Sequence, residues 1–407
     1  MGVAVALAAA ALRTGALGSY LNSLVWYGLQ FGTLAALSVI ELVLWARSGE
    51  LRRPPRRALW VLVPSLVFVA LAALSSLWAA DPLQTLRQVG LLALVFLFLA
   101  TTYAHRWRSP NVRDGDVRTV FWTAIAVQAV GVGGYFAAQT WAVGDYGRFV
   151  GVTANANYAG MGAAVVVALS FALNGLWVRV ASIVPLLALV LSDSRGGLVG
   201  LLFGLVVVLI AVPDFRRDRP SRNWAIATVA CLPVLFLLRA LNVFSALRSR
   251  ASMSAPPGAG GGGGAPGTVL PPPDVTSGRL EIYHDYLQLW LQHPWLGVGY
   301  RTPRFSATGV LYEAHNVYLS VLVELGVVGA VVFVLLLVGA FRSAARGSVL
   351  IAAAATALAL EVTESSIFGL AGPGALMSWL VLFAWASTGL PEVAQAKPAG
   401  AHEPLEE

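Results

Sequence analysis

The sequence predicts an all-α protein that crosses a membrane many times. Of its 407 residues, 57% are hydrophobic and only 12% are charged, whereas charged residues make up about 25% of a typical soluble domain. The mean hydropathy is strongly positive, at +0.73. The apolar residues also gather into stretches long enough to cross a bilayer as helices, with polar connections between them.

These stretches predict about twelve transmembrane helices. They lie near residues 1–17, 22–46, 59–79, 86–104, 119–141, 155–174, 176–192, 196–212, 223–241, 316–341, 347–362 and 366–388. The first is short and rich in alanine; it is either a span or a signal-like segment, although it lacks the basic start of a signal peptide. The turn "SDSRGG" between the seventh and eighth stretches is short enough to require a tight connection.

Arginine placement predicts the orientation of the chain, because basic loops stay in the cytoplasm. Three connections are rich in arginine, at residues 47–57, 105–118 and 213–223, and all three have the same parity. Most of the net charge of +7 is therefore a topology signal, and we expect no nucleic-acid partner.

This topology divides the chain into four parts. Residues 1–241 form a bundle of about nine transmembrane helices, and residues 315–390 form three more. Between them, residues 242–314 form a large extracytoplasmic loop with a Gly/Pro-rich linker and an amphipathic helix at the membrane surface. The apolar face of that helix carries Ile282, Tyr286, Leu289 and Trp290. Residues 391–407 form a disordered cytoplasmic tail.

A few arginines lie on the extracytoplasmic side, where the topology rule does not account for them. They are Arg87, Arg148, Arg195, Arg279 and Arg301. One interpretation is that each pairs with a nearby acid or with lipid head groups. Several of these connections are very short, however, so together they predict one mouth of the bundle in which guanidinium groups gather. Such a group suits a diphosphate.

His315 stands at the start of the tenth span, beside that mouth. The positive end of a helix dipole favours a neutral imidazole, which is the form that a general base needs. On a helix, Tyr318 and Leu322 share its face. The alternative is an interfacial histidine bonded to a loop carbonyl. Glu324 lies two turns further in, on the other side of the helix. We expect it to be paired or protonated within the bundle, with either a structural role or a role in support of the site.

The sequence offers no compact metal site. Cys231 is the only cysteine, so an internal disulfide is excluded, and no group of Cys, His and Asp has the spacing of metal ligands. The protein is either free of metal and cofactors or collects its ligands from scattered positions.

Four stretches resemble the bacterial O-antigen ligase and O-antigen polymerase superfamily, in the order that this family has them. They are "GRFVGVTANANYAG", "LSDSRGGLVGLLFGLVVVL", "SGRLEIYHDYLQLWLQHPWLGVGY" and "AHNVYLSVLVELGVVG". The last resembles the family signature His-Asn-x-Tyr-Leu…Glu-x-Gly-x-x-Gly. The similarity covers residues 145–340 and extends to the layout of spans and outer loop. The run of five glycines in the outer loop has no counterpart in the family pattern.

The resemblance implies a membrane glycosyltransferase of polysaccharide or lipopolysaccharide biosynthesis. Such enzymes lie in the bacterial cytoplasmic membrane and act at its outer face, toward the periplasm or cell exterior. They transfer a glycan from an undecaprenyl-diphosphate carrier to a hydroxyl of a lipid or glycan acceptor, without a metal. By motif, His315 matches the catalytic histidine and Arg195 and Arg279 match the essential arginines. The remaining residues assigned to substrate binding are Arg148, Arg301, Arg87, Asn316 and Tyr318.

Three alternatives stay open at the level of sequence. The protein is a ligase that attaches a finished glycan, or a polymerase of the same superfamily that extends the glycan. A flippase or transporter for lipid-linked glycans also needs many spans and an arginine-lined cavity, but it predicts an internal repeat, and we find none. The last alternative is a structural membrane subunit, in which the motifs serve only to pack the helices together.

Overall fold

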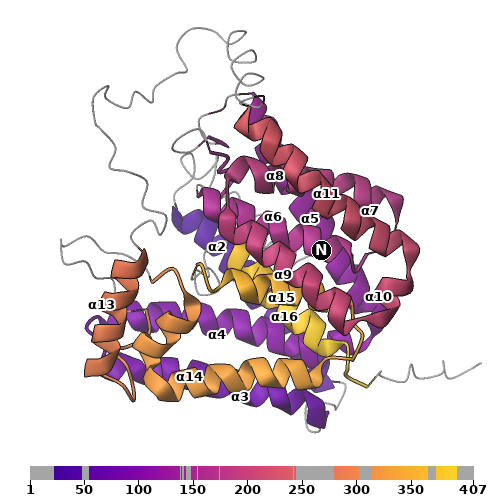
Figure 1. Ribbon diagram of the computed structural model, residues 1–407. Helices are drawn as coiled ribbons and strands as arrows, with labels where there is room; N and C mark the ends of the chain where they lie inside the picture. Colours follow the sequence, from indigo (N-terminus) through magenta and orange to yellow (C-terminus); the bar gives the residue numbers. More distant parts are fainter. Residues whose placement is uncertain are drawn as a thin grey trace, which may run out of the picture.

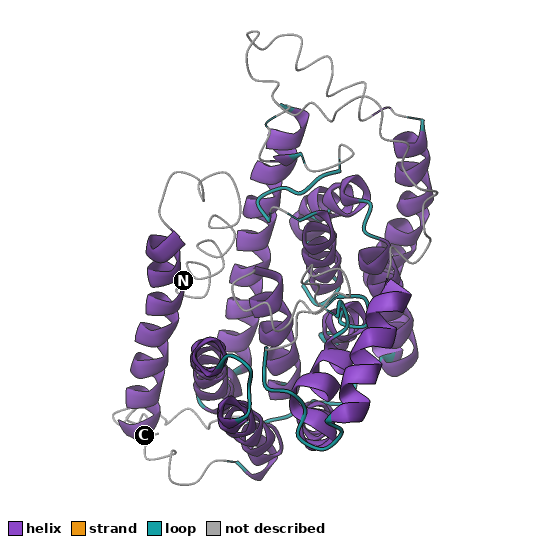
Figure 2. Ribbon diagram, turned by 90° about the vertical axis from the view of Figure 1, so that its left-hand side faces the viewer, coloured by secondary structure: helices purple, strands orange, loops and turns teal. Residues whose placement is uncertain are grey.

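The fold is helical throughout the part of the chain that the structure describes (Figure 2). The computed structural model describes residues 23–47, 55–137, 139, 142–143, 148–153, 155–173, 175–241, 243, 279–301, 314–364 and 373–391. Within these ranges an antiparallel bridge between Val143 and Phe149 is the only β pairing. The predicted span 1–17, the Gly/Pro-rich linker and nearly all of the polar tail lie outside the described residues.

The helices follow the predicted spans closely. They are α2 (Ser23–Arg47), α3 (Arg56–Leu74), α4 (Pro82–Ala104), α5 (Pro110–Phe136), α6 (Ala156–Ser170), α7 (Leu176–Ala181), α8 (Ile183–Ser192), α9 (Arg195–Ala211), α10 (Pro213–Arg217), α11 (Arg219–Ala240), α13 (Arg279–Gln292), α14 (Val317–Ser343), α15 (Ile351–Leu360) and α16 (Pro373–Ser387). Each predicted span from 22–46 onward overlaps one of these helices, or two in the case of α7 and α8, and the largest shift is at α5, which begins at Pro110 instead of residue 119.

Among the described residues, five helical segments are long and apolar enough to cross a membrane. They are Arg56–Leu77, Pro82–Arg108, Pro110–Phe136, Arg219–Ala240 and Val317–Ser343. Shorter apolar helices, such as Arg195–Ala211, accompany them. The all-helical fold is therefore confirmed, and the five candidate spans fit a polytopic membrane protein, while the number of twelve crossings stays a prediction.

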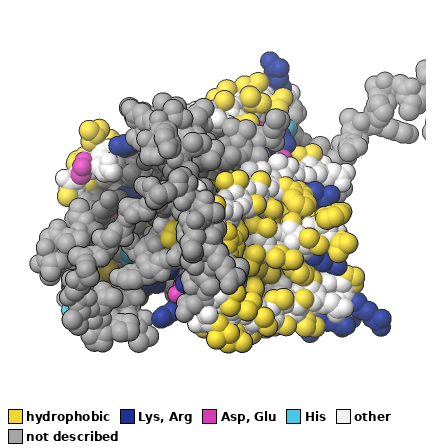
Figure 3. Space-filling model, turned by 90° about the horizontal axis from the view of Figure 1, so that it is seen from above, with side chains coloured by type: hydrophobic (Ala, Val, Ile, Leu, Met, Phe, Trp, Pro, Cys, Tyr) yellow, Lys and Arg dark blue, Asp and Glu magenta, His cyan; other side chains and the backbone are white. Residues whose placement is uncertain are grey.

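The surface of the bundle has the character expected of a membrane protein. Large apolar side chains are exposed on several helices, among them Leu66 on α3 (71%), Ile210 on α9 (73%) and Phe341 on α14 (67%). Figure 3 shows a face on which hydrophobic side chains extend broadly, with Lys and Arg toward its edges. Contact of such an apolar surface with lipid tails carries no free-energy cost, whereas its contact with water is unfavourable.

Small residues bring α9 and α15 together in the middle of the bundle (Figure 1). A Cβ atom on Gly200 would lie 2.7 Å from Cδ2 of Leu360, and one on Gly204 would collide with the hydroxyl of Thr356. Such close backbone approach is how apolar helices associate where lipid removes the hydrophobic drive. The contact fixes the end of α15, and with it the segment that follows, Glu361 to Glu364.

The segment 293–301 docks into a break in α14. Gly326 has φ 66° and ψ −167°, which interrupts the helical hydrogen bonds and frees backbone groups on either side. The amides of Val298 and Gly299 donate to the carbonyls of Val323 (3.0 Å) and Glu324 (2.9 Å). In return, the amide of Val327 donates to the carbonyl of Pro294 at 2.9 Å. The docked segment thus satisfies groups that could not stay unpaired inside a membrane protein.

Glu324 stabilises the same junction. Its side chain is buried (4% exposed), and its Oε2 accepts a hydrogen bond from the backbone amide of Arg301 at 2.9 Å. This carboxylate is therefore paired and positions the docked segment, which is the structural one of the two roles expected of it.

We expect Gly326→Ala to destabilise the protein. A Cβ there would collide with the backbone of Trp295, and a left-handed backbone alone costs a non-glycine residue about 1–3 kcal/mol. The matched control is Gly90→Ala on α4, where a Cβ meets nothing within 4 Å and alanine favours the helix by about 0.5–1 kcal/mol. Thermal unfolding in detergent measures both. Equal melting temperatures for the two variants would contradict the docking described above.

The predicted amphipathic helix is present as α13, but its apolar face does not meet lipid. Tyr286 is buried against Ala314 and Val323, with Ile282 and Leu289 packed around it. The break in α14 supplies this protein surface, which sequence patterning does not reveal. On the other side Leu280, Leu287 and Leu291 are exposed. Figure 1 shows α13 crossing the ends of α3, α4 and α14, so contact of this exposed side with the membrane surface stays a prediction.

Candidate functional site

A group of polar residues meets where six helices begin or end. Arg195 is the first residue of α9, and Asn157 lies in the first turn of α6. Arg239 lies in the last turn of α11 and Arg279 begins α13. His315 lies just before Asn316, the cap of α14, and Glu364 lies in the segment that follows α15.

The predicted tight turn between α8 and α9 is confirmed, and it anchors Arg148. The turn consists of Asp193, whose φ is 55°, and Ser194, whose hydroxyl accepts a hydrogen bond from the amide of Gly197. Arg148 donates through Nε to the carbonyl of Ser192 (2.8 Å) and through an amino group to the carbonyl of Asp193 (3.3 Å). The planar guanidinium fork thereby ties the loop before α6 to the end of α8.

The Asn-x-Asn pair at the start of α6 divides two tasks. The side-chain oxygen of Asn155 accepts from the amides of Asn157 (2.8 Å) and Tyr158 (3.3 Å), which caps the helix. The side chain of Asn157 links two charged groups. Its oxygen accepts from Arg148 at 2.8 Å, and its nitrogen donates to Oε1 of Glu364 at 2.8 Å.

Glu364 is the centre of the site. Its carboxylate is almost fully buried, with 4% of the side chain exposed. Oε1 accepts from Arg279 at 2.8 Å as well as from Asn157, and Oε2 lies 2.7 Å from Nδ1 of His315. We call His315, Glu364, Arg279, Asn157 and Arg148 the Glu364 cluster. A buried carboxylate with three hydrogen-bond partners around it is held in one orientation.

His315 is placed differently from the prediction. Helix α14 begins at Val317, with Asn316 as its cap, so His315 precedes the helix and has φ 48°. Tyr318 and Leu322 therefore do not share a helical face with it. The left-handed backbone is uncommon for a histidine and marks a residue held in place by its surroundings. The Tyr283 hydroxyl donates to the His315 carbonyl (3.4 Å), and the Val317 amide donates to the Glu361 carbonyl (2.8 Å).

The contact with Glu364 fixes the chemistry of the imidazole. A carboxylate accepts hydrogen bonds, so Nδ1 of His315 carries the proton and donates it to Oε2. In a neutral ring the lone pair is then on Nε2, the nitrogen that does not contact Glu364. The histidine side chain is 33% exposed, so the ring is accessible while its partner is buried.

Four arginines surround the carboxylates here, and we call them the arginine group. Burial, together with Arg239 and Arg195 nearby, lowers the pKa of Arg148 from its ordinary value, while Asp193 and Glu364 act in the opposite direction. Arg279 is the fourth, through its contact with Glu364. Two of these four cations form ion pairs, Arg239 with Asp193 and Arg279 with Glu364, so the group carries more positive than negative charge and attracts anions.

Sequence reasoning missed Glu364, Asn157 and Arg239. Arg239 donates to the carbonyl of Leu191 at 2.8 Å and lies 3.5 Å from Asp193. It ends an apolar span on the predicted outer side, so the argument that selected the other outer arginines applies to it equally. Glu364 follows a predicted span in "LEVTESS", where nothing local distinguishes it from an ordinary polar loop residue.

The other predicted site residues do not belong to the Glu364 cluster. Asn316 caps α14 by accepting from the amide of Leu319 (3.0 Å). The hydroxyl of Tyr318 donates to the carbonyl of Leu358 (3.0 Å). Arg87 is exposed on α4. Arg301 follows Tyr300, and the carbonyl of Tyr300 accepts a hydrogen bond from the hydroxyl of Thr85, which is also on α4 (3.0 Å). Within the described ranges, no three His, Cys, Asp or Glu side chains gather where they could hold a metal ion.

Comparison with known proteins identifies the part of the chain that holds most of these residues. No curated protein matches the chain significantly. The sequence profile described as O-antigen ligase matches residues 180–334. This range runs from α7 into α14 and includes Arg195, Arg239, Arg279 and His315, while Arg148, Asn157 and Glu364 lie outside it. The resemblance noted in the sequence is thereby confirmed: residues 180–334 form a domain of the O-antigen ligase family, which is a family of enzymes.

Proposed function

We propose that the protein transfers a glycan from an undecaprenyl-diphosphate carrier to an acceptor hydroxyl at the outer face of the cytoplasmic membrane. The observation that carries the proposal is the Glu364 cluster, in which one buried carboxylate orients both His315 (2.7 Å) and Arg279 (2.8 Å). A histidine base and a group of arginines thus stand together. This is the pair of functions that a transfer from a diphosphate requires.

The arginine group accounts for the leaving group. When the bond between the sugar and the diphosphate breaks, the electron pair goes to the diphosphate oxygen, and negative charge develops there. Guanidinium groups fixed beforehand stabilise that charge through paired hydrogen bonds. Arg195 and Arg279 take this role in the proposal, and Arg148, held by three hydrogen bonds, keeps the binding surface rigid.

His315 accounts for the attacking group. Its Nε2 takes the proton of the acceptor hydroxyl while the hydroxyl oxygen forms the new bond to the anomeric carbon. Glu364 stabilises the imidazolium that results, because its carboxylate stays hydrogen-bonded to Nδ1. Attack and departure occur on opposite faces of the sugar, so a single displacement inverts the anomeric centre.

A transfer assay with purified protein tests this function. The donor is an undecaprenyl-diphosphate-linked glycan, EDTA is present, and a lipid acceptor and the glycan itself are offered separately. We expect turnover, and a loss of about 10²-fold in Arg195→Ala, the usual effect of removing one charge-stabilising donor. The control is Arg217→Ala, because Arg217 is 82% exposed and pairs with Asp214 on the surface; its turnover should equal the wild type.

The outcome also separates the alternatives. Transfer to the lipid acceptor identifies a ligase, and lengthening of the glycan identifies a polymerase. If no acceptor supports turnover while the donor lipid crosses a reconstituted bilayer, the enzyme proposal fails and the protein is a flippase.

A further inference from the structure

Helices α3 and α14 are in direct contact at the end of the bundle that is predicted to face the cytoplasm. The two helices lie side by side (Figure 1), and a Cβ atom on Gly339 would collide with the carbonyl of Trp60. The hydroxyl of Ser343 also donates to the carbonyl of Arg57, at 2.7 Å. Because the two backbones touch, they hold the residues beside the contact in place, among them Trp60 on α3 and Arg342 on α14.

Arg342 stacks on Trp60 across this contact. The central carbon of the guanidinium lies 5.0 Å from the centroid of the indole ring, and both side chains are exposed. Stacking occupies one face of the guanidinium and leaves the N–H groups along its edge available to an anion. The pair therefore presents oriented hydrogen-bond donors at the surface of the bundle.

The charge around this pair is positive. Arg56 lies one turn before Trp60 on α3, on the same side of the helix by its spacing, and it is exposed. Arg346, which is also exposed, follows the end of α14. Within the ranges that the structure describes, no carboxylate pairs with Arg56, Arg342 or Arg346. An anion that reaches these arginines therefore meets no competing carboxylate from the described residues.

Apolar side chains follow the positive group toward the middle of the bundle. Val63 and Leu66 are exposed on α3, and Val334 and Val338 are exposed on α14. Val63 and Val338 each lie one turn from the stacked pair. A free anion would use only the arginines of this surface, whereas a lipid with an anionic head group would use both the arginines and the apolar side chains.

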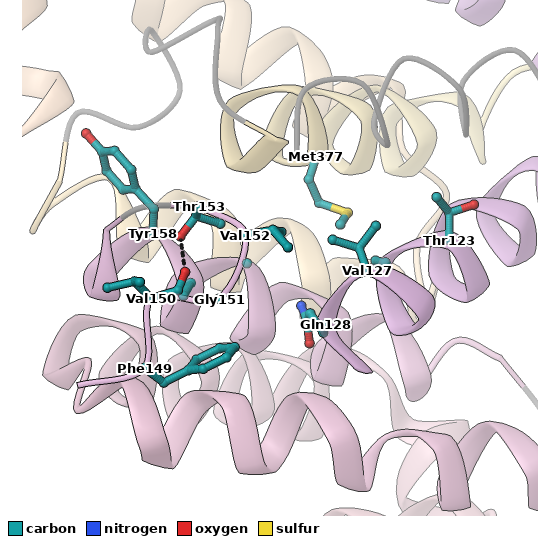
Figure 4. A pocket seen from close by; sticks show the side chains of 13 residues that line it. Thr123, Val127, Gln128, Phe149, Val150, Gly151, Val152, Thr153, Tyr158 and Met377 are labelled. Atoms are coloured by element: carbon teal, nitrogen blue, oxygen red, sulfur yellow. Dashed lines mark hydrogen bonds between the residues drawn. The ribbon is translucent and has the colours of Figure 1, made fainter. Parts of the chain in front are cut away.

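The apolar cavity in Figure 4 has no positive group of this kind. It lies between α5, the segment 149–153, α6 and α16, and its lining includes Val127, Val150 and Met377. The polar side chains that line it, such as Gln128, are uncharged. A lipid phosphate therefore finds cationic partners at the contact of α3 and α14 and not in this cavity.

We propose that an anionic phospholipid binds at this contact, with its phosphate on Arg342 and Arg56 and its acyl chains along the exposed apolar side chains of α3 and α14. We call Arg342, Trp60 and Arg56 the Arg342 site. The same region also holds the end of α16, because Arg57 donates to the carbonyl of Gly389 at 2.8 Å. A lipid bound here thus stabilises the place where α3, α14 and α16 meet, whatever reaction the protein catalyses.

Thermal unfolding of the purified protein in detergent tests the site. Phosphatidylglycerol and phosphatidylcholine with the same acyl chains are titrated separately, and inorganic phosphate is titrated at the same ionic strength. We expect phosphatidylglycerol to raise the melting temperature more than either of the others, because a ligand that binds the folded state stabilises it. An equal shift with phosphatidylcholine or with inorganic phosphate would overturn the proposal.

Arg342→Gln should weaken the binding of phosphatidylglycerol about fivefold, which is the usual contribution of one arginine near anionic lipid. The control is Arg222→Gln on α11. Arg222 is exposed and is predicted to lie on the same side of the membrane, and it donates to the carbonyl of Arg216 (3.5 Å). The control removes the same charge, and its titration should match the wild type. Equal weakening in both variants would mean that the lipid responds to diffuse positive charge, which contradicts a site at Arg342.

The alternative occupant is the polar tail of the chain. Residues 392–407 contain four glutamates, and they follow Pro391, whose carbonyl accepts from Arg108 (3.3 Å) at this end of the bundle. A protein that ends at Pro391 should match the full chain in its melting temperature without lipid and in its titration with phosphatidylglycerol. A lower melting temperature, or tighter binding of the lipid after truncation, would show that the tail occupies the arginines instead.

Discussion

His315→Asn should reduce glycan transfer by about 10²- to 10⁴-fold, the usual contribution of a general base, while the protein stays folded. Asparagine tolerates the left-handed backbone that His315 adopts at φ 48°, and its amide nitrogen can donate to Glu364. The substitution therefore removes the basic nitrogen and little else. Transfer rates, together with thermal unfolding and membrane yield, measure the two effects separately.

The control for this variant is His284→Asn. His284 is exposed on α13, the helix that also supplies Arg279 to the cluster, so the same substitution is made nearby without touching Glu364. Its transfer rate should equal the wild type. Wild-type transfer by His315→Asn would remove His315 from the mechanism.

Glu364→Gln should lower kcat by about 10- to 100-fold, the range typical of losing the partner that orients a histidine. An amide cannot accept from His315, Arg279 and Asn157 together, because one of its two ends is a donor. It also loses the charge that stabilises the imidazolium. For the same reason the acidic limb of the pH–rate profile should move to lower pH, since the protonated ring becomes less favourable.

The chain offers a closely matched control in Glu41→Gln. Glu41 is also buried and also pairs with a histidine and an arginine, at 3.5 Å from His105 and 3.3 Å from Arg106. Its cluster lies where α4 ends, near the far end of α14, because Tyr103 donates to Ser343 (3.0 Å). The 27 residues of α14 span about 40 Å along the helix axis, which is the length between Ser343 at this end and the start of the helix beside His315. Glu41→Gln should lower stability but leave kcat and the pH profile unchanged; a shifted profile in both variants would mean that Glu364 acts only through stability.

Much of the fold follows from the sequence because length and hydropathy constrain membrane helices strongly. The spans from residue 22 onward contain helices close to their predicted bounds, and the tight turn at Asp193–Ser194 is where "SDSRGG" places it. Several arginines of the site could also be identified from the sequence. The positive-inside rule explains most arginines of the chain, so the few that it does not explain stand out. Of the five arginines expected to gather, Arg148, Arg195 and Arg279 lie near one another, while Arg87 and Arg301 do not belong to the Glu364 cluster.

The rest depends on contacts that no local pattern encodes. Glu364 meets Asn157 and Arg279 across 207 and 85 positions of sequence, so its place at the centre appears only when α15 packs on α9. The start of α14 at Val317, and the left-handed backbone of His315 before it, follow from the Asn316 cap and from bonds to α13 and Glu361. Likewise, the apolar face of α13 that the sequence predicts at the membrane surface packs against Ala314 and Val323.

In the proposed reaction, a hydroxyl activated at His315 displaces the lipid diphosphate in one step. The configuration of the new glycosidic bond, measured by NMR on the product of the purified protein and compared with the donor, tests this claim directly. Direct displacement predicts an inverted anomeric centre. A product with retained configuration would require a covalent glycosyl intermediate, and would contradict the assignment of His315 as the base that acts on the acceptor.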